Sequence, residues 1–200
     1  MNNSDDQEIK VILVGESGTG KTSLINIAMG VKFVEGVEAS TSTASFVTKK
    51  IKIGGKSYSL NLWDTIGQEK FRSLTKIFIK DSKIVIFVYD ITRIDSFKEL
   101  NYWFKTIQDV LGDTAVLGIA GNKHDLFMKE QVKEEVAEKY AEDKGVPFKL
   151  TSAKNPLSFN TFLEDLLKKY IEKSGGVIES KDGQKLDDNK EKPDKGKKCC

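Results

Sequence analysis

Along this chain, short runs of apolar residues alternate with stretches in which apolar residues recur every three or four positions. Three runs, at 9–14, 83–90 and 115–121, are almost continuously apolar, as is typical of strands that are buried on both faces of a sheet. Helical spacing begins at Lys21 and recurs in two later stretches. Their apolar positions are Phe97, Leu100, Phe104, Ile107 and Leu111 in the first, and Phe159, Phe162, Leu163, Leu166, Leu167 and Tyr170 in the second. This alternation predicts an α/β fold, with a mostly parallel sheet covered by helices on both faces.

Residues 45–53 and 56–64 show a different pattern, in which polar and apolar positions alternate on either side of Gly54-Gly55. A two-residue glycine link between such segments predicts a β-hairpin. The hairpin adds one antiparallel edge strand to the otherwise parallel sheet. A further strand-like segment, PFKL, lies at 147–150.

The composition is that of an ordinary globular protein, with 38% hydrophobic and 31% charged residues in a chain of 200, which is long enough for one domain. The net charge of +2 is too small to indicate nucleic acid as a partner. No apolar run reaches the roughly 20 residues that span a bilayer. The first ten residues lack the basic and apolar blocks of a secretory signal, so we expect a protein that is made and kept in the cytosol.

The composition changes at Ser174. The segment 174–200 is polar, mixed in charge and nearly free of large apolar residues, so it cannot bury enough surface to fold. We expect a flexible N-terminus over 1–8, one globular domain over 9–173 and a disordered tail over 174–200.

The first chemical motif follows the first apolar run, where residues 15–22 read GESGTGKT and match G-x-x-x-x-G-K-[ST]. Glycines at this spacing let the backbone curl so that successive N–H groups face phosphate oxygens. Lys21 adds a positive charge for the β and γ phosphates, and the Thr22 hydroxyl can bind Mg²⁺. The helix that follows points its positive dipole end at the same anion. The predicted phosphate-binding residues are Gly15, Ser17, Gly18, Thr19, Gly20, Lys21 and Thr22.

Two later segments indicate which nucleotide binds. GNKHDL (121–126) follows an apolar strand and TSAK (151–154) follows PFKL. Together with GESGTGKT, they make the chain resemble the small GTPases of the Ras superfamily, and within it the Rab family, over residues 9–173. The resemblance implies the P-loop GTPase fold with a six-stranded sheet.

The resemblance also implies a guanine site. Asp125 is expected to accept hydrogen bonds from two donors on the base, a pair that adenine lacks. The remaining base-site residues implied by the family are Asn122, Lys123, Ser152, Ala153 and Lys154. Phe33 stands where the family places an aromatic that covers the base, although a core position remains an alternative for it.

The same resemblance assigns the residues that respond to the γ-phosphate. Thr41 is expected to bind Mg²⁺ with Thr22, and Asp64 to act through a metal-bound water. Thr43 is an alternative to Thr41, because the segment around it departs from the family pattern. Gly67 is expected to offer its N–H to the γ-phosphate, and Gln68 to orient the attacking water.

The segment DTIGQE (64–69) contains one residue that does not fit this role. The family usually has alanine where Ile66 stands. The extra carbon atoms cost about 1–3 kcal/mol in a packed position if the loop cannot move, and otherwise shift its conformational equilibrium. We expect a working but slow switch, and the alternative is a GTP-binding scaffold with little or no hydrolysis.

Several features favour the Rab family over its relatives. Phe46, Trp63 and Phe78 match an aromatic triad that contacts effectors in that family, and such a cluster is a credible binding hot spot. The chain ends in KGKKCC, and the resemblance implies that Cys199 and Cys200 each carry a geranylgeranyl chain. Two lipids give stable membrane anchoring, whereas one gives marginal binding.

We therefore expect a Rab-like GTPase that hydrolyses GTP with Mg²⁺ and regulates vesicle traffic on the cytoplasmic face of an intracellular membrane, cycling through the cytosol. No arginine occupies a motif position that suggests a built-in arginine finger, so a slow intrinsic rate is expected, with Lys21 and Gln68 as the catalytic residues. The partners implied by the family are a guanine-nucleotide exchange factor, a GTPase-activating protein, a GDP-dissociation inhibitor, a prenylation escort protein and effectors.

Overall fold

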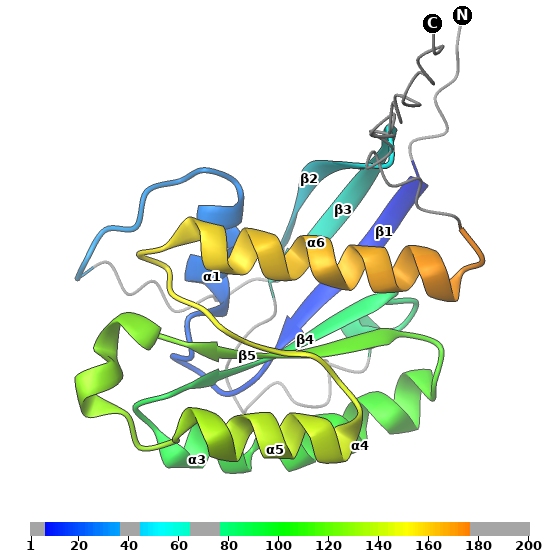
Figure 1. Ribbon diagram of the computed structural model, residues 1–200. Coiled ribbons are helices and arrows are strands. Elements are labelled where there is room, and N and C mark those ends of the chain that lie inside the picture. Colours follow the sequence, from blue (N-terminus) through cyan, green and yellow to red (C-terminus); the bar gives the residue numbers. More distant parts are fainter. Residues whose placement is uncertain (1–6, 37–44, 65–76, 177–200) are drawn as a thin grey trace, which may run out of the picture.

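The computed structural model of the protein describes residues 7–36, 45–64 and 77–176. A six-stranded sheet forms its centre, with helices on both sides (Figure 1). The strands are β1 (Gln7–Val14), β2 (Ser45–Ile53), β3 (Lys56–Asp64), β4 (Ile84–Asp90), β5 (Val116–Asn122) and β6 (Phe148–Leu150). Their order in the sheet is β2-β3-β1-β4-β5-β6, and every neighbouring pair is parallel except β2 and β3. The predicted fold, with its single antiparallel edge strand, is confirmed.

The hairpin forms at the predicted glycines. Gly54 and Gly55 have φ angles of 56° and 80°, and positive φ at both central residues is the requirement of a tight two-residue turn that matches strand twist. The ladder is continuous from Ile53↔Lys56 to Ser45↔Asp64. In the middle of the sheet, β1 starts at Gln7, two residues before its apolar run, because the backbone of Gln7 and Glu8 pairs with β3.

The helices are α1 (Lys21–Ala28), α3 (Ile94–Lys98), α4 (Leu100–Leu111), η2 (His124–Lys129), α5 (Glu134–Lys144) and α6 (Pro156–Lys173). The first long helical stretch of the sequence is interrupted at Glu99, between α3 and α4. The spacing of large apolar residues in the sequence did not predict α5, because the buried residues of this helix are only Ala137 and Ala141. Two small side chains give a weak periodic signal.

The core consists of two apolar layers, one on each face of the sheet. Helices α1 and α6 cover one face, and α4 and α5 cover the other (Figure 1). In the first layer Phe159, Phe162 and Leu166 of α6 pack against the sheet. In the second layer the rings of Phe87 and Phe104 stack with their centroids 3.9 Å apart.

The strand order places the site. In the sheet, β1 lies between β3 on one side and β4 on the other. The strands β3 and β4 are therefore added on opposite sides of β1, so the strand order reverses there. In open α/β sheets, ligands bind beyond the carboxyl ends of the strands at such a reversal. The segment that follows β1 is GESGTGKT, and the carboxyl ends of β4 and β5 lie beside it.

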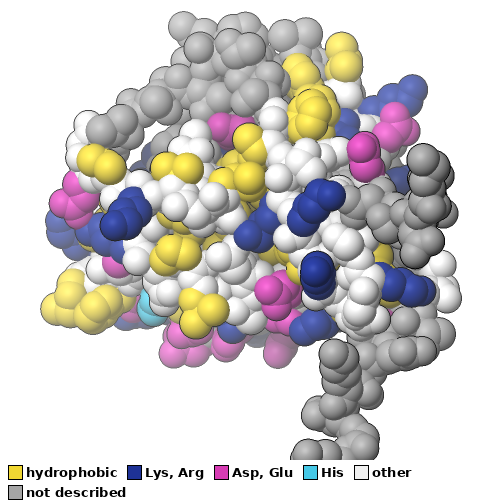
Figure 2. All heavy atoms as spheres, turned by 90° about the horizontal axis from the view of Figure 1, so that it is seen from above, with side chains coloured by type: hydrophobic (Ala, Val, Ile, Leu, Met, Phe, Trp, Pro, Cys, Tyr) yellow, Lys and Arg dark blue, Asp and Glu magenta, His cyan; other side chains and the backbone are white. Residues whose placement is uncertain are grey.

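The surface carries charges of both signs. On the face drawn in Figure 2, hydrophobic side chains lie in small groups between basic and acidic ones. Within the described ranges, no helix has both the length and the apolar character needed to cross a bilayer.

The packing of α6 generates a prediction. Phe162 is 2% exposed, whereas Leu157 on the same helix is 73% exposed. Phe162→Ala should lower the free energy of unfolding by about 3–5 kcal/mol, because it removes a large buried side chain and leaves a cavity. Leu157→Ala should change it by less than about 0.5 kcal/mol. Urea unfolding of both variants under identical conditions measures the difference, and equal losses would contradict the assignment of the buried face.

Candidate nucleotide-binding site

The loop between β1 and α1 depends on its glycines. Gly15 has φ 147°, and a Cβ there would lie 2.0 Å from the carbonyl oxygen of Val88. Gly20 has φ 91°, and its Cβ would lie 2.4 Å from Nδ2 of Asn122. No side chain fits at either position, so the loop can curl closely against β4 and β5 only because both residues are glycine.

Side chains hold several carbonyl groups of this loop. Lys21 Nζ donates to the carbonyls of Gly15 and Glu16, both at 2.9 Å. Thr19 Oγ1 also donates to the Glu16 carbonyl at 2.9 Å, and Asn122 Nδ2 donates to the Thr19 carbonyl at 2.8 Å. In a planar trans peptide, the N–H points opposite to the C=O. Each bound carbonyl therefore fixes the direction of the N–H group that follows it.

Lys21 is the buried cation of the site, with 5% of its surface exposed. Burial lowers its pKa to about 8, while Asp64 and Glu16 act in the opposite direction. Because water is excluded, a phosphate beside Lys21 would restore the stabilisation that its ammonium group has lost. The predicted role of Lys21 as the phosphate counter-charge fits this position.

Asn122 connects the two halves of the site. Its side chain is buried at the carboxyl end of β5, where Nδ2 reaches the phosphate-binding loop and Oδ1 accepts a bond from Thr151 Oγ1 at 3.3 Å. Sequence motifs separated by about a hundred residues therefore meet at one amide. The neighbouring Lys123 has φ 65° and pairs with the buried Asp90, with Nζ 2.8 Å from Oδ2.

The predicted base residues gather next to Asn122. Ser152 Oγ donates to Asp125 Oδ1 at 2.6 Å, and Lys154 Nζ lies 3.4 Å from Asp125 Oδ2. Lys154 also pairs with Glu35, and this hydrogen bond raises the pKa of Lys154. A cavity of about 400 Å³ opens beside them. Its lining residues are Lys32, Phe33, Glu35, Ala153, Lys154 and Pro156.

Phe33 belongs to this cavity and not to the core, because 41% of its surface is exposed. This position is compatible with the prediction that Phe33 covers the base, which stays a prediction. The alternative that Phe33 is a core residue is not supported. His124, at the variable position of the base motif, is exposed on the surface.

The aromatic triad forms on the sheet edge. The rings of Phe46 and Trp63 stack with centroids 4.9 Å apart, and Phe78 lies 6.2 Å from Trp63. Lys10 Nζ stands 4.7 Å above the Trp63 ring. Phe46 is half exposed, whereas Trp63 and Phe78 are partly buried against the core, so the effector-binding role of the triad stays a prediction.

Two of the three expected magnesium ligands lie within the described ranges. Thr22 is the second residue of α1, and Asp64 ends β3 beside the loop, close enough for its carboxylate to affect the pKa of Lys21. A hydroxyl and a carboxylate are the oxygen donors that Mg²⁺ prefers, so these residues fit the metal. Several other residues of the predicted site lie outside the described residues, namely Thr41, Thr43, Ile66, Gly67, Gln68, Cys199 and Cys200.

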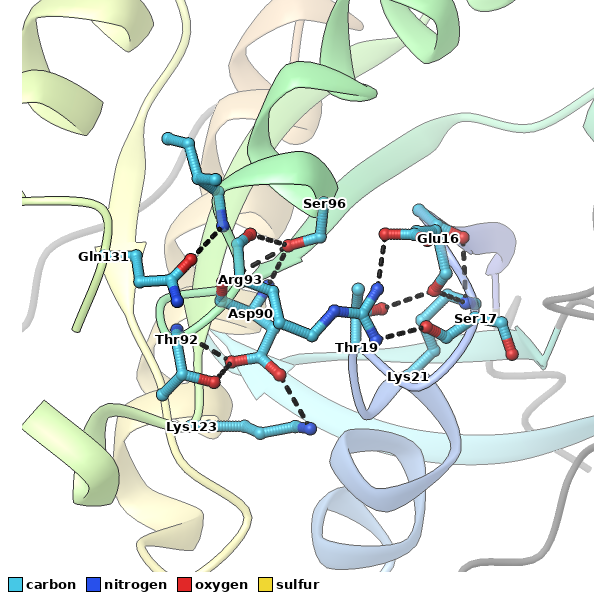
Figure 3. Close-up of polar contacts among 12 residues, drawn as sticks. Glu16, Ser17, Thr19, Lys21, Asp90, Thr92, Arg93, Ser96, Lys123 and Gln131 are labelled. Carbon is cyan, nitrogen blue, oxygen red and sulfur yellow. Dashed lines mark hydrogen bonds and ion pairs between the residues drawn. The ribbon is translucent and has the colours of Figure 1, made fainter. Parts of the chain in front are cut away.

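Sequence reasoning missed Arg93. This residue lies in the link between β4 and α3, and its guanidinium contacts Glu16 and the Ser17 carbonyl (Figure 3). It belongs to no sequence motif, so no pattern along the chain indicated it. Arg93 reaches the loop because the segment after β4 lies beside the loop after β1 in the folded protein.

Comparison with known proteins shows the family of the chain. The Ras family model matches residues 10–172. The Ras-related protein Rab-21 of Homo sapiens is 39% identical over 203 residues, which cover 96% of this chain and 90% of the relative. Rab-21 of Bos taurus is 44% identical over 163 residues, covering 82% and 73%. Rab-26 of Rattus norvegicus is 35% identical over 195 residues, covering 98% and 76%.

The chain therefore belongs to the Ras family and, within it, to the Rab small GTPases. The resemblance drawn from the motifs is confirmed. Membership implies a GTP-dependent switch in vesicle traffic and association with an intracellular membrane. Ras-family proteins generally bind GTP, GDP and Mg²⁺, and work with exchange factors, activating proteins, dissociation inhibitors and effectors.

The pKa of Lys21 generates the second prediction. Bound phosphates need the charged ammonium, but the free protein loses this proton above pH 8, so binding must then restore it. The affinity for GDP should fall as pH rises, by about tenfold between pH 7 and pH 9. GMP has the same titrating base but no β-phosphate for Lys21, so its affinity should fall less. Titration calorimetry of both ligands across this range measures the effect, and identical pH profiles would contradict the role of Lys21.

Proposed function

We propose that this chain binds GTP and GDP, hydrolyses GTP to GDP and phosphate, and acts as a Rab-type switch at a membrane. The bond from Asn122 to Thr19 is the observation that carries the proposal. It places the base motif directly against the phosphate-binding loop, so one nucleotide can occupy both. A cavity beside Lys154 and Phe33 is available for the base.

In the proposed function, Asp125 selects guanine. Ser152 already donates to one of its oxygens and Lys154 lies near the other, so the carboxylate is held in place before a base arrives. Two adjacent donors on the guanine edge would complete its hydrogen bonds, whereas adenine lacks this pair and would leave the carboxylate without donors on its base-facing side. The Ala153 backbone and Phe33 complete the base site.

The hydrolytic step in the proposal requires few covalent roles from the protein. Thr22, Thr41 and Asp64 hold Mg²⁺, directly or through water, and the metal neutralises charge on the phosphates when it is bound. Lys21 holds the β and γ phosphates, the Gly67 N–H contacts the γ-phosphate, and Gln68 orients the attacking water. We propose a slow intrinsic rate that an activating protein raises.

Membrane anchoring in the proposal depends on the tail. Residues 174–200 are proposed to form a flexible tether, with geranylgeranyl chains on Cys199 and Cys200. The 27 residues have a root-mean-square reach of roughly 30 Å, and the lysines of KGKKCC add attraction to anionic headgroups of about 1 kcal/mol each. Phe46, Trp63 and Phe78 are proposed as the effector-contacting surface, and an escort protein as the partner for prenylation.

The specificity of the base site provides the third prediction. The protein should bind GDP at least roughly a hundredfold more tightly than ADP, because a site with a fixed bidentate acceptor rejects a base that lacks two adjacent donors. Asp125→Asn should shift the preference toward xanthine nucleotides, since the carboxamide can donate to the xanthine carbonyl. His124→Ala is the matched control and should leave the preference unchanged. Competition binding with GDP, ADP and xanthosine diphosphate measures the preference, and equal displacement of GDP by ADP would overturn the proposal.

Hydrolysis provides the fourth prediction. Wild-type protein should hydrolyse bound GTP in a single turnover at a rate of the order of 10⁻⁴ s⁻¹. Gln68→Leu should lower the rate about tenfold, because the water loses its positioning partner. Ile66→Ala should raise it about fivefold, the factor that corresponds to about 1 kcal/mol of relieved crowding. Phosphate release after mixing with Mg²⁺ measures all three, and equal rates in wild type and Gln68→Leu with GTP bound would identify a scaffold.

A further inference from the structure

Arg93 reaches the phosphate-binding loop from outside, on the side of α3 (Figure 3). Its Nη1 donates to the carbonyl oxygen of Ser17 at 3.1 Å, and its Nη2 pairs with the carboxylate of Glu16. Nη1 would also lie 3.1 Å from a Cβ placed on Gly18. The guanidinium therefore touches three successive residues of the loop.

The main chain of Arg93 is itself fixed. Its N–H donates to the carbonyl of Asp90 at 3.0 Å, and its carbonyl accepts a bond from Ser96 Oγ at 2.7 Å. The following residue, Ile94, donates its N–H to Gln131 Oε1 at 3.1 Å. The side chain thus extends from an anchored turn, and its guanidinium approaches the loop from a defined direction.

Peptide geometry gives this contact a consequence. The described residues contain no cis peptide bond, so the Ser17 carbonyl and the Gly18 N–H point in opposite directions. With Arg93 bound to the carbonyl, the Gly18 N–H points away from Arg93. A charged donor on a carbonyl also polarises the peptide and strengthens its N–H as a donor.

We propose that Arg93 is a positioning residue for phosphate binding, which orients the Ser17–Gly18 peptide so that the Gly18 N–H faces the terminal phosphates of the nucleotide. The proposal rests on the proposed function, because it requires a guanine nucleotide in the loop. Glu16 holds the second half of the guanidinium and leaves Nη1 on the carbonyl.

The place of Gly18 in the loop predicts which ligands depend on it. Gly20 lies against Asn122, next to the base pocket, whereas Gly18 lies against Arg93. Phosphates further from the base therefore meet the Gly18 N–H. A defect in this peptide should weaken GTP and GDP binding more than GMP binding.

An exposed ion pair would not give this pattern. The side chains of Arg93 and Glu16 are 39% and 28% exposed, and a surface pair of this kind contributes little to stability. If the pair only tied two loops together, its loss would affect every ligand of the site alike. Dependence on the number of phosphates separates the two roles.

The test uses the full chain and measures dissociation constants for GMP, GDP and GTP in wild type, Arg93→Gln and Arg93→Lys. Arg93→Gln should weaken GDP and GTP about tenfold and leave GMP within about twofold, a difference of about 1.4 kcal/mol between ligands. Arg93→Lys should recover only part of the loss, because one ammonium cannot hold both the carbonyl and the carboxylate in the fork geometry.

Lys98→Ala is the matched control, since it breaks the exposed Lys98–Asp95 pair on α3, whose atoms lie 3.3 Å apart, and should leave all three constants unchanged. Retained GMP binding shows that the Arg93 variants fold. Unchanged GDP and GTP binding, an equal loss for GMP, or full recovery in Arg93→Lys would each overturn the proposal. Failure of the wild-type protein to bind any guanine nucleotide would instead overturn the proposed function.

Discussion

The site depends on the two hydrogen bonds made by the buried side chain of Asn122. One buried amide joins the loop after β1 to the segment after β6, with Nδ2 on the Thr19 carbonyl and Oδ1 on the Thr151 hydroxyl. It provides a partner for polar groups of two other chain segments at once, and leaving either of them buried without a partner would be costly. Because Gly20 allows Asn122 to approach so closely, the distance between the phosphate half and the base half is set by contact between two residues.

Charge is arranged around this link in pairs. Lys123 meets Asp90, Arg93 meets Glu16, and Lys154 meets Asp125 and Glu35. Lys21 differs from these cations, because its ammonium group donates to the backbone carbonyls of Gly15 and Glu16. The buried ammonium lacks the hydration that would stabilise it, and an arriving phosphate supplies the strongest compensation. The site is therefore most attractive to anions at the point where the β-phosphate of a nucleotide is expected.

The sequence predicted those parts of the molecule that depend on local patterns. Gly54-Gly55 specifies its own turn, the apolar runs specify buried strands, and GESGTGKT specifies a loop through glycines that no other residue can replace. The features that were missed depend on long-range contacts or on small side chains. Arg93 acquires its place only when β4 pairs with β1, the Glu35–Lys154 contact joins segments 119 residues apart, and α5 buries alanines that carry little periodic signal.

That small-residue face of α5 has a consequence for how the native state opens. At this edge of the sheet, β6 has three residues and pairs with β5 alone among the described strands, while the buried residues of α5 are two alanines. The opposite edge, β2, is paired along nine residues. Local opening at β6 breaks only the three-residue pairing of β5 with β6, the shortest in the described sheet, so the amide hydrogens of β6 and α5 should exchange with solvent before those of β1 and β4. The proposed base-binding segment TSAK follows β6 directly, so one wall of the proposed guanine pocket is attached to the shortest strand pairing of the described sheet.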